Sequence, residues 1–265
     1  MTRQDKAFAP ARQPGLCVEF FGLPGSGKTT IARVVSTMLA QSDPGLIFAP
    51  NLLADEAGAA KRAAAKLRLV LSGLGRSAGQ LGSASKAFLI RQPRLRDKLR
   101  AATAIATATA VYRHADHQQR QVIQDQGVLQ ALWSVQLRAT GGNVGALVDP
   151  MLKEAAGSGR IHISVETPTR VCAERLGMRA SKHSRMQTSA ATQDPNVWET
   201  AELLRRTLLG NLRAAYRKQG IAPRIIVVDG TADPISAARQ IVAGLARTRQ
   251  EMTAPQSQHL REVIA

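Results

Sequence analysis

Short apolar runs alternate with amphipathic segments along most of the chain. The runs are rich in β-branched and aromatic residues and are bounded by turn-forming residues, a pattern typical of strands that are buried on both faces. Five of these runs are predicted as strands: LCVEFF (16–21), GLIFA (45–49), QVIQD (121–125), RIHISV (160–165) and RIIVVD (224–229). Helical patterns lie between them, so the sequence predicts an α/β domain with a doubly covered parallel sheet and a ligand site at the carboxyl ends of its strands.

Two helical regions stand apart from simple crossovers. Residues 52–120 are alanine-rich, basic and mostly helical in pattern, and they are too long for one crossover, which predicts a helical insertion or cap beside the ligand site. Residues 194–220 form a strong amphipathic pattern, with Asp194 as the expected N-cap, Pro195 at the first helical position and Gly220 past the end. The core stripe expected on this second helix consists of Leu203, Leu204, Leu208 and Leu212.

The two ends of the chain differ from the part between them. Residues 1–14 are expected to form a loose leader, and residues 249–265, which are rich in Gln and other polar residues, a weakly ordered tail. The domain is therefore expected to span residues 15–248. The leader has no apolar signal core, and no stretch of the sequence approaches the length needed to span a bilayer, so we expect a cytoplasmic protein.

A glycine-rich loop, GLPGSGKTT (22–30), follows the first predicted strand and opens a helix. It matches the pattern G-x-x-x-x-G-K-[ST], in which backbone N–H groups curl around a polyphosphate at the positive end of the helix. Lys28 is expected to reach the β- and γ-phosphates, and Thr29 to bind Mg²⁺. The residues expected at the nucleotide are Gly22, Gly25, Ser26, Gly27, Lys28, Thr29 and Thr30. The implied ligand is ATP or GTP with Mg²⁺, because the loop recognises phosphates and not the base.

A carboxylate stands at the end of the third predicted strand, where a nucleotide-dependent enzyme needs one. Asp125 is suited to holding Mg²⁺ through water or to accepting the proton of an acceptor hydroxyl. It is also suited to capping the helix that is expected to start near Gly127. The sequence leaves these three roles open.

Arginines follow the fourth predicted strand. Arg175 and Arg179 lie four residues apart on one face of a predicted helix, and Arg185 follows within a segment (180–193) that we expect to form a lid. Guanidinium groups placed in this way can stabilise the charge that develops on a transferring phosphoryl group. The same spacing also fits a solvated helix face.

The net charge of +17 is concentrated in one part of the chain. Residues 60–120 contain thirteen Lys and Arg against two Asp, a charge that could attract nucleic acid, an anionic membrane surface or a phosphorylated small substrate. An aromatic content of 3% and the lack of a base-reading motif disfavour nucleic acid. The two cysteines, Cys17 and Cys172, lie in predicted core segments without metal-ligand spacing and are expected to be reduced, packed thiols.

Together these segments resemble the P-loop kinases of nucleosides and nucleoside monophosphates, especially the thymidylate kinase and deoxynucleoside kinase branch. GLPGSGKTT is similar to their phosphate loop, and VIQDQG (122–127) lies where they carry an acidic residue. ETPTRVCAERLGMR (166–179) resembles their connection from a strand to an arginine-bearing lid, and VVDG (227–230) looks like the end of their last strand. The resemblance implies a P-loop NTPase three-layer fold with a five-stranded parallel sheet, and transfer of the γ-phosphoryl group of MgATP to a small acceptor.

The expected activity is thus that of a MgATP-dependent phosphotransferase acting on a small anionic or hydroxylated metabolite, with nucleosides and nucleotides among the candidates. Arg91, Arg94 and Arg96 are suited to an anionic group of the acceptor. Two alternatives stay open. One is a regulatory or nucleic-acid-associated P-loop ATPase that grips a polyanion with its basic segment, and the other is a kinase-like scaffold that has lost transfer, suggested by Gln126 where the family has arginine. The sequence assigns no oligomeric state.

Overall fold

The strands form a single five-stranded parallel sheet in the order β2-β3-β1-β4-β5. The structure is a computed structural model, and it describes residues 16–49, 95–137, 145–179, 186 and 194–253. The strands are β1 (Cys17–Phe21), β2 (Ile47–Phe48), β3 (Val122–Gln124), β4 (Arg160–Glu166) and β5 (Ile225–Asp229). Each of the five predicted strands is therefore confirmed, and the sheet is parallel as expected.

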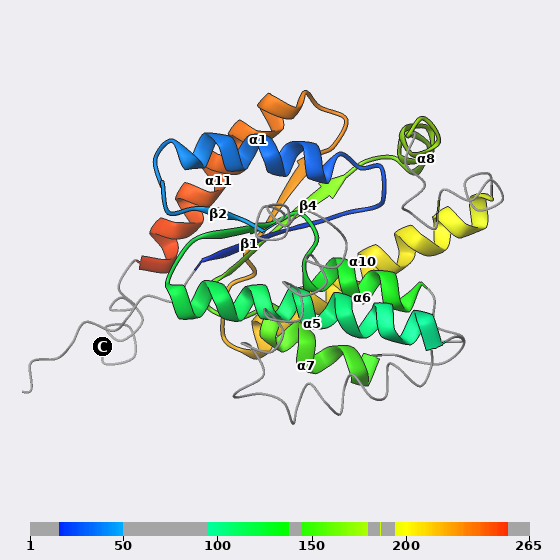
Figure 1. The fold of residues 1–265 in the computed structure, drawn as a ribbon, viewed down its shortest axis with the longest axis horizontal. Helices are drawn as coiled ribbons and strands as arrows, with labels where there is room; N and C mark the ends of the chain where they lie inside the picture. The colour runs from blue at the N-terminus through cyan, green and yellow to red at the C-terminus, as the bar shows by residue number, and fades with distance from the viewer. Residues whose placement is uncertain (1–15, 50–94, 138–144, 180–185, 187–193, 254–265) are drawn as a thin grey trace, which may run out of the picture.

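Helices cover both faces of this sheet, which makes the fold three-layered (Figure 1). Helices α1 and α11 pack on one face, and α5, α6, α7 and α10 pack on the other. The helices are α1 (Lys28–Ala40), α5 (Leu95–Gln118), α6 (Val128–Gln136), α7 (Gly145–Ala155), α8 (Thr169–Gly177), α10 (Pro195–Lys218) and α11 (Pro234–Thr253).

Strand β1 lies at the centre of the sheet and fixes the position of the ligand edge. Val18 and Phe20 pack towards α1 and α11, whereas Cys17 and Phe21 pack into the opposite core, and all four side chains are fully buried. Burial on both faces explains why the run is almost continuously apolar. Because β3 and β4 flank β1, the loops that follow these three strands meet at the carboxyl edge of the sheet, where ligands of such folds bind.

Helix α10 begins and ends as its sequence predicts. The side chain of Asp194 caps its first turn, and Gly220 beyond its end has the left-handed φ of 67°. Leu208 and Leu212 are fully buried, but Leu203 is 65% exposed, so its place in the core stripe was wrong. At about 100° per residue, position 203 lies on the far side of the helix from the buried pair.

The structure describes part of the predicted helical insertion and part of the predicted tail. Within the expected insertion, residues 95–118 form the single helix α5, while residues 52–94 and the leader lie outside the described residues. Helix α11 continues to Thr253 and so extends into the segment predicted as a tail. In the described parts of the chain, no helix combines the length and apolar character needed to cross a bilayer.

Candidate functional site

The loop between β1 and α1 has the shape of an anion cradle. Gly25 and Gly27 have φ values of 86° and 93°, in the left-handed region that side chains other than glycine rarely adopt, and this lets the backbone curl before α1 begins at Lys28. Ser26 Oγ is buried in the loop and has no hydrogen-bond partner among the described residues. A buried polar atom without a partner is costly, so a ligand oxygen at this place would be favoured.

Lys28 is buried inside the curl of the loop. Its Nζ donates to the carbonyl oxygens of Gly22 and Leu23, at 2.8 Å each. Burial lowers the pKa of Lys28 to about 8, the charge of Asp125 opposes this change, and the charge of Arg179 adds to it. The amine, the carboxylate and the guanidinium are thus near enough to influence one another.

Thr29 and Asp125 meet at the rim of the loop. Thr29 Oγ1 donates to Asp125 Oδ2 at 3.0 Å, although the residues are 96 positions apart in the sequence. The next residue, Thr30, is exposed. The structure therefore brings together the hydroxyl expected to bind Mg²⁺ and the carboxylate for which binding Mg²⁺ is one of the three possible roles. With this glycine-rich loop between the first strand and the first helix of a five-stranded parallel sheet, the chain has the P-loop α/β fold.

Capping is not the role of Asp125. Gly127 occupies the N-cap of α6 and offers no side chain, and the amide of Leu129 donates to Glu19 Oε1 at 2.6 Å. Gln126 is exposed beside Asp125. The carboxylate of Asp125 is thus left for the ligand side of the loop.

The arginines after β4 are arranged differently from the prediction. Arg175 is half-buried on α8, and its Nη1 donates to Gly230 O at 2.8 Å, which ties α8 to the loop after β5. Arg179 does not share its helical face, because α8 ends at Gly177, and the Arg179 side chain is exposed. Arg185 and the rest of the expected lid, apart from Met186, lie outside the described residues.

The phosphate loop rests on the connection between β4 and α8. Thr167 Oγ1 donates to Ser26 O at 3.1 Å. A side chain on Gly25 would overlap the carbonyl oxygen of Cys172 in the first half of α8. Cys17 and Cys172 are free and buried, which confirms the prediction of reduced, packed thiols. The loop therefore packs against the β4–α8 connection and the first half of α8.

Replacing Gly25 by alanine is expected to weaken nucleotide binding at least tenfold and to lower the stability of the chain. A Cβ there has both an unfavourable φ and no space, and such strained positions cost about 1–3 kcal/mol. Thermal denaturation and nucleotide titration measure the two effects. Gly210→Ala is the matched control, because the exposed mid-helix Gly210 has open space and the change should stabilise α10 by up to about 1 kcal/mol. Equal behaviour of the two variants would contradict the strain assigned to Gly25.

Comparison with known proteins gives limited similarity. No model of a known protein family matches the sequence, and no curated protein matches it significantly. Similar solved structures include deoxyadenosine kinase from M. mycoides with bound dATP, with a TM-score of 0.47 and 13% identity, over 87% of this chain and 100% of that chain. The same enzyme with bound dCTP gives a TM-score of 0.44 and 16% identity, over 88% and 100% of the two chains. The structure of this enzyme with the products dCMP and a flexible dCDP gives a TM-score of 0.44 and 14% identity, over 88% of this chain and 100% of that chain. At these values the similarity by itself does not indicate a function.

The donor atoms near the loop fit Mg²⁺. Among the described residues, no three His, Cys, Asp or Glu side chains are grouped to hold a metal by themselves. Thr29 and Asp125 supply a hydroxyl and a carboxylate, and Mg²⁺ prefers oxygen ligands and often completes its shell with waters and substrate phosphates. The residues present therefore suit a magnesium ion that arrives with a nucleotide.

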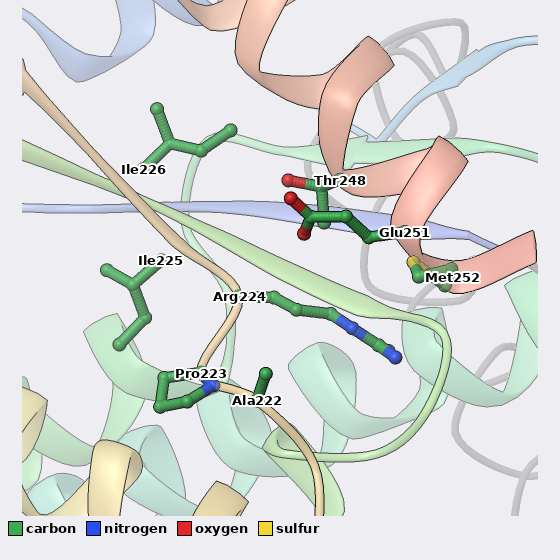
Figure 2. Close-up of a pocket in the computed structure, with 8 residues that line it drawn as sticks. All are labelled: Ala222, Pro223, Arg224, Ile225, Ile226, Thr248, Glu251 and Met252. Atoms are coloured by element: carbon green, nitrogen blue, oxygen red, sulfur yellow. The ribbon is translucent and has the colours of Figure 1, made fainter. Parts of the chain in front are cut away.

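A separate cavity of about 150 Å³ lies at the other end of β5. Figure 2 shows it between the segment that leads into β5 and the last turns of α11, with Arg224, Thr248 and Glu251 among its lining residues. It opens at the amino end of β5, whereas Asp229 and the phosphate loop lie at the carboxyl edge of the sheet. The cavity thus belongs to a different part of the molecule from the candidate site.

Sequence reasoning missed two buried charged residues near the site. Arg205 on α10 bonds Glu202 at 2.7 Å and donates to Ser164 Oγ at 3.1 Å, close to the carboxyl end of β4. Glu19 is fully buried within β1. A single charge inside an apolar run was the available signal for Glu19, while Arg205 reads as one of several charges on an amphipathic helix.

Proposed function

We propose that the protein is a phosphotransferase that uses MgATP to phosphorylate a small hydroxylated acceptor, and that it works in the cytoplasm. The contact between Thr29 Oγ1 and Asp125 Oδ2 carries this proposal, because it supports a metal-binding pair at the rim of a phosphate loop. The loop alone would fit any triphosphate-binding protein. A carboxylate beside it adds the group that phosphoryl transfer needs.

On the donor side, the loop binds the triphosphate and Lys28 neutralises it. Amides of the glycine-rich loop would donate to the phosphates, and Lys28 would exchange its carbonyl partners for the β- and γ-phosphate oxygens. Thr29 and Asp125 would hold Mg²⁺, whose positive charge would offset the charge of the phosphates. Ser26 Oγ, which has no partner in the part of the chain that the structure describes, would donate to a ligand oxygen in this arrangement.

On the acceptor side, an acceptor oxygen attacks the γ-phosphorus as the bond from that phosphorus to the β,γ-bridging oxygen breaks. The proton of the acceptor hydroxyl passes to Asp125 or to water, and ADP leaves with the electron pair of the broken bond. The role proposed for Arg175, Arg179 and Arg185 is to stabilise the equatorial oxygens of the transferring phosphoryl group. Nucleosides and nucleoside monophosphates are the first acceptors to test, because the sequence motifs resemble kinases of these compounds. The nucleic-acid-associated ATPase remains an alternative, since most of its basic segment lies outside the described residues.

The test is transfer of label from γ-labelled ATP to a panel of deoxynucleosides, nucleoside monophosphates and small hydroxylated metabolites, at millimolar Mg²⁺. A labelled product with one class of acceptor is expected. GTP in place of ATP identifies the donor base. If calorimetry detects no binding of ATP or GTP in the presence of Mg²⁺, the proposal is wrong. Binding without transfer to any acceptor would favour a scaffold or an ATPase.

The pKa of Lys28 sets an upper pH limit for nucleotide binding. Burial lowers this pKa to about 8 in the free protein, and the negative charge of a triphosphate raises it again in the complex. Below pH 8 the amine is already protonated, so affinity is nearly constant. At higher pH, binding requires proton uptake, and the dissociation constant should rise by up to about tenfold per pH unit. Calorimetry above and below pH 8, in two buffers with different heats of protonation, measures the number of protons taken up on binding. An affinity that stays constant above pH 8 would contradict the prediction.

A further inference from the structure

Glu19 is a fully buried carboxylate that the proposed chemistry does not use. It lies in β1, shortly before the phosphate loop, and its side chain has no exposed surface. Buried carboxylates normally pair with a cation, because desolvation of an isolated charge is costly. The His162 Nε2 atom lies 3.8 Å from Glu19 Oε2, but burial lowers the pKa of His162 to about 3, so that ring is neutral near pH 7. The stabilising partners of the carboxylate must therefore be hydrogen-bond donors.

Those donors come from the first turn of α6 and from α5. Oε1 accepts a hydrogen bond from the amide of Leu129 at 2.6 Å, and Oε2 accepts one from the phenol of Tyr112. The amides of Val128 and Gln130 also stabilise the charged carboxylate. The amides at a helix N-terminus lack partners within the helix, and the helix dipole favours a negative charge there. Glu19 thus serves as the acceptor for the start of α6, although it belongs to another element.

The loop that carries Asp125 is held between two attachments to β1. On one side, Glu19 is the register partner of Gln124, the last residue of β3. On the other side, the Glu19 carboxylate holds the first turn of α6. The residues between these attachments are Asp125, Gln126 and Gly127, so the position of Asp125 is set from both ends of a three-residue loop.

The fit of this arrangement is tight. A side chain at Gly127 would overlap the carboxyl carbon of Glu19, so the loop passes directly over the carboxylate. The carboxylate of Asp125 itself accepts a hydrogen bond from Thr29 Oγ1. A shift of the first turn of α6 would therefore be transmitted through Gly127 to the Asp125 carboxylate.

We propose that Glu19 is a positioning residue: by binding the N-terminus of α6, it fixes the loop that directs Asp125 towards Thr29 and the reacting phosphate. This inference rests on the role of Asp125 in the proposed function. The Glu19 carboxylate bonds the amides of α6 and the phenol of Tyr112, so its effect on Asp125 would pass through the backbone of α6. Its removal should lower the rate of transfer without weakening the binding of ATP.

Protonation of Glu19 offers a readout that a purely structural role would not give. Burial raises the pKa of Glu19 to about 7, and its hydrogen bonds to Tyr112 and the α6 amides limit that rise. The other titratable groups facing it are Cys17 on β1, Tyr112 on α5, His162 on β4 and Tyr216 on α10. Burial raises the pKa of Cys17 to about 12, raises those of both tyrosines and lowers that of His162 to about 3, so none of them titrates near pH 7. Charged Arg160 and its partner Asp116 lie farther along the same layer.

The experiment compares Glu19→Gln with wild type over pH 6–9. Glutamine keeps the shape and an acceptor oxygen but carries no charge. We expect kcat to fall by about tenfold to a hundredfold with KM for ATP unchanged, and the inflection of kcat near pH 7 to disappear. Tyr216→Phe is the control: it removes the hydroxyl that bonds Arg160 O and His162 Nδ1 in the same buried layer, and neither bond involves an amide of α6, so kcat should stay at the wild-type value. A wild-type kcat and pH profile in Glu19→Gln, or an equal loss in Tyr216→Phe, would overturn the proposal.

A second measurement needs neither catalysis nor a folded variant. Amide hydrogen exchange in the wild-type protein reports protection at Val128, Leu129 and Gln130, with the amides of α1 as internal reference. Protection at these three amides relative to α1 should decrease several-fold as the pH falls from 8 to 6. Unchanged relative protection would show that the charge of Glu19 does not hold the first turn of α6 and would overturn the proposal that it fixes the loop through that charge. If no acceptor is ever phosphorylated, the proposed function fails, while this measurement still decides whether Glu19 holds the loop of Asp125.

Discussion

Lys28→Ala is expected to lower kcat/KM for phosphoryl transfer by at least about a hundredfold. The amine is the cation that the loop places inside its own curl, next to where the phosphates bind, and its charge is worth most in the transition state. The fold should hold, because the substitution removes a buried charge whose bonds, among the described residues, go to the carbonyl oxygens of Gly22 and Leu23. Initial rates with saturating acceptor and varied ATP separate the loss into kcat and KM.

The control for this change is Lys153→Ala, which removes an exposed lysine on α7. That variant should keep wild-type kinetics. Circular dichroism and a thermal melt establish that both variants are folded. Transfer by Lys28→Ala within about fivefold of the wild-type rate would remove the loop from the proposed mechanism.

Asp125→Asn is expected to reduce kcat by about a hundredfold or more, whichever of its two roles applies. As a metal-linked group it loses the negative charge that attracts Mg²⁺, and as a base it loses the ability to accept a proton. A magnesium titration tells the roles apart. The half-saturating Mg²⁺ concentration should rise several-fold if Asp125 helps to bind the metal and should stay constant if it acts only as a base.

Binding of ATP without Mg²⁺ should change little in Asp125→Asn, since Asp125 is not part of the phosphate cradle. The matched control is Asp149→Asn, an exposed carboxylate on α7 that should leave transfer unaffected. If Asp125→Asn retains both the rate and the magnesium dependence of the wild type, the pair with Thr29 has no function in transfer.

Local sequence patterns were sufficient for the fold and for the phosphate loop. Strands such as Cys17–Phe21 are apolar because they are buried on both faces, and the glycines of the loop follow directly from the backbone shape it needs. Likewise, Asp194 is recognisable as a cap because its partner amide lies two residues away. Signals of this kind are contained within a short stretch of chain.

Features that depend on distant partners were missed or misjudged. The bond from Leu129 N to Glu19 joins residues 110 positions apart, so no window of sequence could reveal that Glu19 takes the place of a cap for α6. Arg179 was placed on a helical face with Arg175, but α8 ends at Gly177, and such end points are set by packing as much as by propensity. The contact between Thr29 and Asp125 follows from the parallel topology, which brings the carboxyl ends of β1 and β3 to one edge of the sheet.

The packing of Gly25 on Cys172 has a practical consequence for probing the chain. With two cysteines in the sequence, both buried and both with a raised pKa, the folded protein should react slowly with alkylating reagents. A cysteine introduced at an exposed position such as Arg179 would then carry a fluorophore at one defined place, without deletion of the native thiols. The rate at which Cys172 is modified, in turn, would report how often the phosphate loop separates from α8.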